Sequence, residues 1–405
     1  MKKGLGKWLG LALAVSIAAA GVWNGPPSAH AAGSGFSDVK ASHWAVGAIN
    51  KAVAKGYVDG YTNGMFKPDA SVTRAEFVKM VVVAMKLDTA PAGGKWYSEY
   101  VNAASAAGLY AGDDFANNEA AWTKVMTREE MARVAARAIG EKTTEGDKWM
   151  YLATKTGLIQ GVGKGKIAPT GLTTRAQSVV IIERILKAKA GGELDTDQYA
   201  TAEAEILWHG TNIFTVMPEM FVTPESDWKN KGKSSVEEMW NEKNMTITSK
   251  DGLYQAKLEA LVAIDMADPN DPNRGMLGDV NTLKWYNGKQ VGLELVKHPI
   301  KNEKNTYVLY FKSRQVFNKD KTKYPNLPFA RFYVGGFNNL DDKGFMDGKL
   351  NRSTSIYRDR DGDVPATIVP KTGTVQGISD ISISLQIPSN SRFMEVDLLR
   401  LRGTQ

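Results

Sequence analysis

The sequence predicts a multidomain protein of the α + β class, with a helical N-terminal half and an antiparallel, β-rich C-terminal half. Its 405 residues, 43% of them hydrophobic, are enough for two or more separate cores. Up to residue 191, a pattern typical of helix, glycine loop and helix occurs three times, and from residue 192 short alternating segments follow. We therefore expect domains over residues 32–92, 93–141, 142–191 and 192–405.

The first 31 residues have the features of a secretion signal. Three lysines form a basic start, an apolar stretch runs over residues 9–20, and Ala29-His30-Ala31 is a small-residue cleavage site. The apolar stretch is short and is followed by prolines, so it does not fit a permanent membrane span, which needs about 20 apolar residues. We expect a secreted mature chain without a membrane span.

Charge and cysteine content limit the ways in which this chain can be retained. The absence of cysteine excludes a disulfide framework, a thiol nucleophile and a lipidated cysteine. The tail over residues 400–405 has no apolar span, so we expect any attachment to be non-covalent. Residues 32–191 contain 21 Lys and Arg against 15 Asp and Glu, whereas residues 192–405 contain 27 against 29. The positive half favours an anionic partner.

Four-residue anchors mark the three copies of the repeat. They are Thr73-Arg74-Ala75-Glu76, Thr127-Arg128-Glu129-Glu130 and Thr174-Arg175-Ala176-Gln177. A threonine followed three residues later by Glu or Gln, ahead of an apolar helix, predicts a capping box. In that motif the threonine hydroxyl and the acid or amide each bond a backbone N–H of the helix start. A pair of glycines precedes each anchor, at positions 56 and 60, 108 and 112, and 157 and 161.

These motifs resemble the S-layer homology family. The likeness is carried by Phe36-Ser37-Asp38-Val39, His43-Trp44-Ala45, Phe66-Lys67-Pro68 and Val72-Thr73-Arg74-Ala75-Glu76, and it covers about residues 36–190. The resemblance implies three S-layer homology repeats, the first three domains above, packed as a pseudo-threefold bundle. It also implies attachment to a bacterial cell wall, through an anionic secondary cell wall polymer whose pyruvate ketals meet the anchor arginines in grooves between repeats.

The anchor arginines have two interpretations. A cation in the first turn faces the positive end of the helix dipole, so helix stability alone does not select it. Either its stem packs on a neighbouring repeat, or the guanidinium and the free N–H groups of the helix start bind a carboxylate, while the second glycine of each pair lets a sugar approach. The candidate ligand-binding residues are Arg74, Arg128, Arg175, Thr73, Thr127, Gly60, Gly112 and Gly161.

Three further residues of the motif are candidates. Trp44 and Trp96 either stack on a sugar ring or fill the interface between repeats, and packing is the more usual role of such residues. Asp38 orients an arginine, accepts a sugar hydroxyl or begins the first helix. The third copy departs from the pattern, because Trp149 lies close to its glycine pair and Ser178 replaces an apolar residue. We expect this copy to bind weakly or to serve structurally.

From residue 193 onward, two short helices, around 201–207 and 234–242, are predicted to precede a set of strands. The segment 381–387 alternates apolar and polar residues, as a strand with one buried face does. Asn287-Gly288 predicts a hairpin turn. Further strands are expected at 245–248, 253–264, 306–311, 330–334 and 393–401. Such a set suggests an antiparallel sandwich or barrel.

The C-terminal half has no evident catalytic constellation. His209 and His298 are isolated, and no common zinc or serine hydrolase motif occurs. Asp359, Asp361 and Asp363 are a weak calcium candidate, because no glutamate follows at loop spacing, and a solvated turn is the more usual structure. No other cofactor and no nucleic acid is expected.

We therefore expect a wall-anchored surface protein, either an S-layer or an S-layer-associated structural protein, with the β-rich domain displayed outward. The alternative is a carbohydrate-binding module or a glycan-active hydrolase in residues 192–405, since paired carboxylates can lie far apart in sequence. Assembly of the protein with itself in a lattice is left open.

Overall fold

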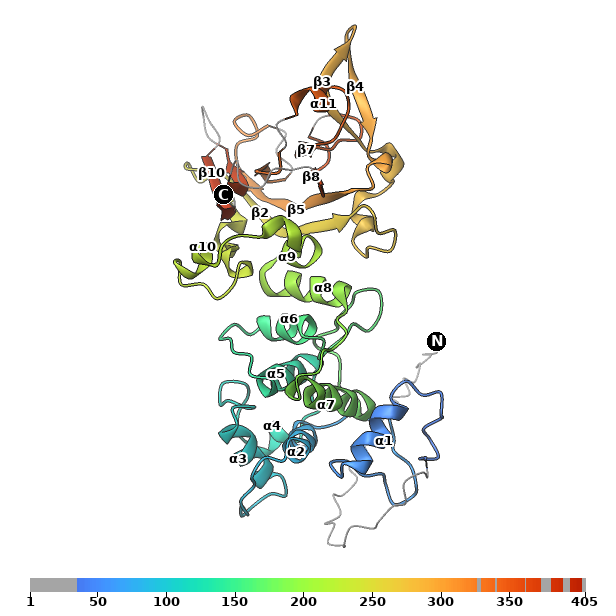
Figure 1. The fold of residues 1–405 in the computed structure, drawn as a ribbon. Coiled ribbons are helices and arrows are strands. Elements are labelled where there is room, and N and C mark those ends of the chain that lie inside the picture. The colour runs from blue at the N-terminus through green and yellow to red at the C-terminus, as the bar shows by residue number, and fades with distance from the viewer. Residues whose placement is uncertain are drawn as a thin grey trace, which may run out of the picture.

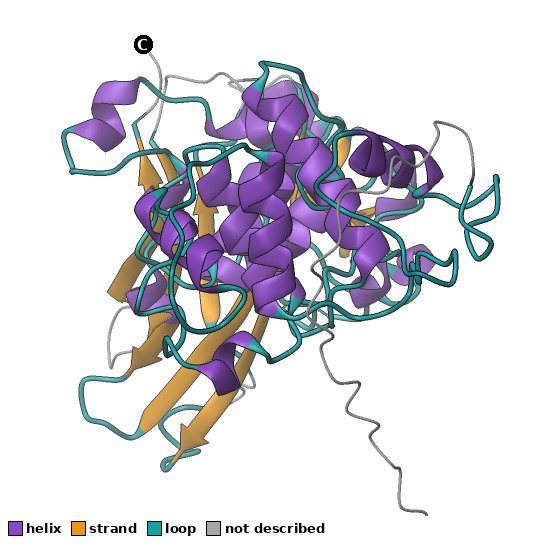
Figure 2. Ribbon diagram, turned by 90° about the horizontal axis from the view of Figure 1, so that it is seen from below, coloured by secondary structure: helices purple, strands orange, loops and turns teal. Residues whose placement is uncertain are grey.

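A computed structural model describes residues 35–325, 329–338, 341–360, 362–372, 380–388 and 394–402. The predicted secretion signal lies outside these ranges. The molecule is elongated, with helices at one end, sheets at the other, and α8 (Gln198–His209) and α9 (Ile213–Val216) between them (Figure 1). Seen from the helical end in Figure 2, the helices lie in front of the strands. No helix of the described residues is both long and apolar enough to cross a membrane.

The helical half consists of three helix–loop–helix units, which we number 1 to 3. In each unit the second helix begins at the anchor arginine, because the preceding threonine caps it. The helices that the repeats predict are therefore present. Unit 1 contains α1 (Val46–Ala54) and α2 (Arg74–Ala84), unit 2 contains α3 (Ser98–Ala106), α4 (Glu119–Trp122) and α5 (Arg128–Ala138), and unit 3 contains α6 (Lys148–Lys155) and α7 (Arg175–Lys189).

The three units meet in a closed ring of backbone hydrogen bonds. The Val72 N–H donates to the Thr173 carbonyl (3.0 Å), the Thr173 N–H to Met126 (2.9 Å), and the Met126 N–H back to Val72 (2.9 Å). Each of these residues directly precedes an anchor threonine. The ring gives the helical half approximate threefold symmetry and brings the three helix starts together.

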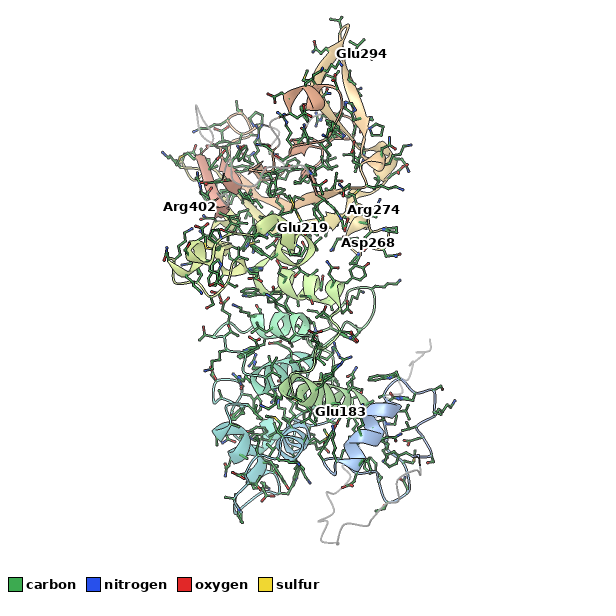
Figure 3. The ribbon with its side chains drawn as sticks, in the orientation of Figure 1. Glu183, Glu219, Asp268, Arg274, Glu294 and Arg402 are labelled. Atoms are coloured by element: carbon green, nitrogen blue, oxygen red, sulfur yellow. The ribbon has the colours of Figure 1, made fainter. Side chains whose placement is uncertain are left out.

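One apolar core fills the helical half. It is formed by the inward faces of the unit helices, with Ile49, Phe77 and Met131 fully buried. Ion pairing at the rim links units 1 and 3: Glu183 of α7, labelled in Figure 3, accepts from Lys55 of α1 at 2.7 Å. Trp208 of α8 belongs to the same core, so this core continues past residue 191.

A short segment after α9 leads into the sheets. It contains η1 (Pro218–Phe221), α10 (Glu225–Lys229), η2 (Glu237–Met239) and η3 (Glu242–Met245). The helix expected around 234–242 is present only as the 3₁₀ turn η2, because Trp240 is extended (ψ 132°) and packs into the β core.

The C-terminal half is built from antiparallel sheets, as predicted. Between the two larger sheets, Phe311 and Phe332 stack with ring centroids 3.9 Å apart, and Ile383 and Leu385 are fully buried in the shared core. The first sheet has the order β1 (Thr246–Thr248), β2 (Tyr254–Asp265), β5 (Thr306–Asn318), β8 (Ala366–Pro370) and β7 (Thr354–Ser355), and the second has the order β10 (Met394–Leu401), β9 (Ile381–Ile387) and β6 (Arg331–Gly335). Connecting segments contain η4 (Arg274–Leu277), η5 (Val280–Thr282), η6 (Ile300–Asn302) and α11 (Asp342–Met346).

A projecting hairpin corrects one prediction. It is formed by β3 (Lys284–Val291) and β4 (Glu294–Pro299), and Glu294 lies at its tip in Figure 3. The turn is at residues 292–293, so the turn predicted at Asn287-Gly288 is wrong. Those two residues form an irregularity within β3 instead, because the buried Asn287 amide donates to the Phe345 and Met346 carbonyls at 2.9 and 3.0 Å.

Candidate functional site

All three predicted capping boxes are present. The Thr73 hydroxyl accepts from the Glu76 N–H at 3.2 Å, and the Glu76 carboxylate accepts from the Thr73 N–H at 2.7 Å. Thr127 and Glu130 make the same pair of bonds at 3.3 and 3.0 Å. In unit 3 the amide oxygen of Gln177 replaces the carboxylate, at 3.0 Å from the backbone nitrogen of its threonine.

The first and third N–H groups of each anchor helix are not free, which corrects the expected anion site. The N–H groups of Arg74, Arg128 and Arg175 donate to carbonyls of the neighbouring units, at 3.0, 2.8 and 2.9 Å respectively. The third N–H of each helix is taken by the capping threonine. An outside anion therefore finds no unpaired N–H at these positions, because the loop of the next unit already satisfies them.

Two anchor arginines reach across to the next unit in the same way. Arg128 donates from Nε to the Ile167 carbonyl (2.9 Å) and from Nη2 to the Gln160 carbonyl (2.8 Å). Arg175 makes the equivalent bonds to unit 1, with Phe66 and Asp59 as acceptors, both at 2.9 Å. Of the two interpretations of the anchor arginines, packing of the side chain on a neighbouring unit therefore applies to both Arg128 and Arg175. Neither guanidinium forms an ion pair with a carboxylate of the described residues.

Arg74 has different surroundings. Its Nε and Nη2 donate to the two oxygens of the Glu130 carboxylate, at 3.1 Å for Nε, and its Nη1 donates to the Ala121 carbonyl at 2.9 Å. The guanidinium lies over the Phe115 ring, 4.1 Å from its centroid. Unit 2 has two more residues between its second glycine and its threonine than the other units, and α4 occupies this longer loop.

The pocket beside Arg74 is small. The residues that line it come from α2, α5 and the long loop of unit 2, with Tyr110 and Trp122 among them. Its cavity of about 10 Å³ has room for about one water molecule. With the Glu130 carboxylate on Arg74, this pocket therefore has no room for a sugar.

A second guanidinium lies beside Arg128. Arg184 of α7 donates from Nη2 to the side-chain oxygen of Gln160 (2.9 Å) and from Nη1 to the Leu158 carbonyl (3.2 Å). Burial, and then the charge of Arg184, lower the pKa of Arg128. Sequence reasoning missed Arg184, although Arg137 and Arg184 each follow their anchor threonine by ten residues.

The second glycine of each pair, at position 60, 112 or 161, has different surroundings in each unit. A Cβ at Gly60 would meet the Phe36 ring at 2.2 Å, and one at Gly161 would lie 3.1 Å from the Asp197 carboxylate. The room expected there for a sugar is filled by this chain itself, so that expectation is wrong for both. Next to Gly112 no described atom lies within 4 Å of the added carbon.

The two motif tryptophans lie on the surface. Trp44 is 64% exposed and Trp96 is 49% exposed, so the interpretation that they fill interfaces is wrong. The Lys79 ammonium lies 5.7 Å from the Trp96 ring centroid. Trp149 of unit 3 is instead buried, with the Arg137 guanidinium 4.8 Å from its ring.

Asp38 holds the loop that supports Arg175. Its carboxylate accepts from the N–H groups of Phe66 and Lys67, at 2.8 and 2.7 Å. It does not begin a helix, because α1 starts eight residues later, and that alternative is wrong. Lys67 of this loop and Arg175 of α7 both lie against the Tyr61 ring, with their charged groups 4.3 and 5.1 Å from its centroid.

Comparison with known proteins identifies a family for part of the helical half. Residues 35–78 match the family model for the S-layer homology domain. The chain carries an S-layer homology domain. It is 31% identical to an amylopullulanase of Thermoanaerobacterium thermosulfurigenes over 179 residues (38% of this chain, 9% of the relative) and 30% identical to exoglucanase XynX of Acetivibrio thermocellus over 181 residues (38% and 16%). It is also 39% identical to the S-layer protein sap of Bacillus anthracis over 90 residues (20% and 11%).

These relatives are much longer proteins, and the matched part of this chain spans no more than 16% of the length of any of the three. The S-layer homology domain is a non-catalytic module that anchors proteins at the cell wall, and the relatives that this chain resembles include both enzymes and S-layer proteins. It indicates a location at the cell wall surface.

The remaining candidates, which lie in the C-terminal half and in α8, make contacts that stabilise the fold. The Asp363 carboxylate accepts from the backbone N–H groups of Arg358, Asp359 and Arg360, at 2.9, 2.7 and 3.1 Å, as in a turn. Asp361 lies outside the described residues. Within the described part of the chain, no group of three or more His, Asp or Glu is placed to hold a metal. His209 and His298 stack on neighbouring tryptophans.

Proposed function

We propose that this protein attaches to the cell wall by binding an anionic, pyruvylated secondary cell wall polymer between its helical units. It then displays its β-rich half as an S-layer or S-layer-associated structural protein. The observation that carries this proposal is Arg128, a buried cation that forms no ion pair with a carboxylate of the described residues and has a second guanidinium, Arg184, beside it. The Asp195 carboxylate acts on Arg184 but is not among the groups that act on Arg128.

Electrostatics supports an anionic ligand at this pair. Arg128 is 5% exposed, and its bonds go to neutral carbonyls. A buried charge without a counter-charge is costly, so a carboxylate that enters this place gains a charge-assisted hydrogen bond worth about 1.5–3 kcal/mol. Arg175, with Lys67 and Tyr61 beside it, offers a second place of the same character between units 3 and 1.

The exposed tryptophans support the sugar part of the proposal. Trp44 and Trp96 present flat apolar rings to solvent, which suits stacking on a sugar ring. The acid would then be held by arginine and the ring by tryptophan. The C-terminal half is proposed to be structural, because no feature of the described residues favours catalysis.

The test is binding of the mature full chain to purified cell walls, measured by co-sedimentation. We expect Arg128→Ala and Arg175→Ala each to weaken binding at least about tenfold, equivalent to about 1.4 kcal/mol. Chemical removal of the acidic polymer from the walls should abolish binding. Arg314→Ala is the control, because that arginine is exposed on β5. Undiminished binding by both variants, or by polymer-free walls, would refute the proposal.

A further inference from the structure

The acid at the third position of each anchor helix differs in what it contacts. In unit 2 the Glu130 carboxylate caps its own helix and also accepts both bonds from Arg74 of unit 1. In unit 1 the Glu76 carboxylate bonds only Thr73 among the described residues. In unit 3 the corresponding residue is Gln177, which carries no charge and lies in the unit that Arg128 reaches. One of the three boundaries between units is therefore already supplied with a carboxylate.

The geometry at Arg74 is that of a bound carboxylate. Two nitrogens of one guanidinium donate to the two oxygens of one acid, which is the arrangement that a planar acid ligand would adopt. The Arg74 side chain is 7% exposed and that of Glu130 is 20% exposed, so both members of the pair are largely shielded from solvent. An outside acid would have to displace Glu130 to reach the same nitrogens.

We propose that Glu130 is an internal carboxylate that occupies Arg74 and withholds the boundary between units 1 and 2 from the polymer. The acid groups of the polymer are then taken at the boundaries where Arg128 and Arg175 lie. This inference rests on the proposed function, since it assigns the binding of that polymer to particular boundaries.

The charge state of Glu130 is consistent with a permanently filled site. Burial acts to raise the pKa of this carboxyl, but the hydrogen bonds from Arg74 and from the Thr127 N–H outweigh burial and lower it below its ordinary value. The carboxylate therefore stays ionised at neutral pH, and Arg74 stays paired.

Glu130→Gln tests the inference with a conservative change. Gln177 caps α7 through its amide oxygen, so a glutamine at position 130 should still cap α5. It removes the counter-charge of Arg74. Glu76→Gln is the matched control, because it makes the same change in a capping box without an arginine partner.

The probes are a monosaccharide that carries a pyruvate ketal and the same sugar without the ketal. Calorimetric titration of the mature full chain gives the number of ketal-dependent sites. We expect Glu130→Gln to gain one such site over the unaltered protein and Glu76→Gln to gain none. Adding Arg74→Ala to Glu130→Gln should remove the gained site.

Each outcome decides the inference separately from the proposed function. Equal numbers of sites in the Glu130→Gln and Glu76→Gln variants would overturn it, even if the unaltered protein binds the ketal sugar. If the unaltered protein binds no ketal sugar, the proposed function fails, whereas a site gained by Glu130→Gln alone would still support the internal carboxylate.

A second measurement on the unaltered protein does not depend on the folding of a variant. Arginine side-chain NMR signals are followed during addition of the ketal sugar. We expect the Nε–H signals of Arg128 and Arg175 to shift and that of Arg74 to stay in place. A shift of the Arg74 signal as large as that of Arg128 would also overturn the inference.

Discussion

At the scale of single residues, the four tryptophans of units 1 to 3 fall into two groups. Trp122 is 1% exposed and packs in edge-on contact with Tyr110 and Phe115, while Trp149 is buried against Arg137. Trp44 and Trp96 lie on the surface, although an exposed indole loses the large gain that burial gives an aromatic side chain. Stability therefore accounts for the first group and does not account for the second.

We expect Trp44→Ala and Trp96→Ala to weaken wall binding several-fold while they change the free energy of unfolding by no more than about 0.5 kcal/mol. Trp122→Ala should instead destabilise the protein by about 3–5 kcal/mol, because it leaves a cavity in the core. Co-sedimentation with walls and denaturant unfolding measure the two quantities. Unchanged binding by both surface variants would rule out the stacking role.

The residue scale also shows which parts of the candidate site the sequence could predict. The capping boxes were predicted correctly because their partners lie three residues apart. The hydrogen-bond partners of the anchor arginines were not predicted, because the accepting residues lie 32 to 116 residues away along the chain. The pairing of Arg74 with Glu130, 56 residues on, depends on how unit 1 meets unit 2.

At the scale of elements, the start of each anchor helix serves both the helix and the assembly of the units. The threonine caps the helix, while the residue before it donates into the central ring of backbone bonds. A helix that lost its cap would also loosen the segment that holds the three units together. Thr127 additionally pairs with Leu172 of unit 3 through an isolated bridge.

Thr127→Ala should lower the free energy of unfolding by about 1 kcal/mol, within a range of about 0.5–2 kcal/mol, because it removes the oxygen that accepts the Glu130 N–H. Thr127→Ser keeps that oxygen and should cost much less. Denaturant unfolding of both variants provides the comparison. Equal losses in the two variants would mean that the methyl group, and not the cap, is what matters.

The elements of the C-terminal half show where local signals fail. Alternating apolar residues located β9 correctly, because one face of that strand is buried. Gly288 has a positive φ of 80°, but Asn287 does not share it as an Asn-Gly turn requires, and the chain turns at residues 292–293 instead. The buried Asn287 amide bonds α11, nearly 60 residues away, and no local pattern reports that contact.

At the scale of the whole molecule, the β-rich half is fixed to unit 3 by a charged contact. The Lys155 ammonium of α6 lies 2.6 Å from the Glu237 carboxylate, and Tyr151 donates to the same acid at 3.2 Å. Lys148 of α6 pairs with Glu238. This contact joins the segment that precedes the sheets to α6 of unit 3, in addition to the apolar contact that Trp208 of α8 makes in the helical core.

The strength of this contact should depend on acidity through Glu237. Burial acts to raise the pKa of its carboxyl, but the charge of Lys155 and the hydrogen bond it donates outweigh burial and lower the pKa from 4.5 to about 2. A carboxyl with a lowered pKa in the folded protein contributes stability above its unfolded value and loses it as the pH falls. The stabilisation should therefore be complete above about pH 5 and decline between about pH 4.5 and 2.

We expect Glu237→Gln to destabilise the protein by about 1–2 kcal/mol at pH 7, a value reduced from the full pKa shift because Lys155 is half exposed. The difference between this variant and the unaltered protein should shrink as the pH is lowered from 5 towards 2, because protonation removes the same charge. Denaturant unfolding at a series of pH values measures it. Glu225→Gln is the control, since that acid pairs with an exposed lysine and is itself 69% exposed. A difference that stays constant over this pH range would show that the charge of Glu237 does not hold the two halves together.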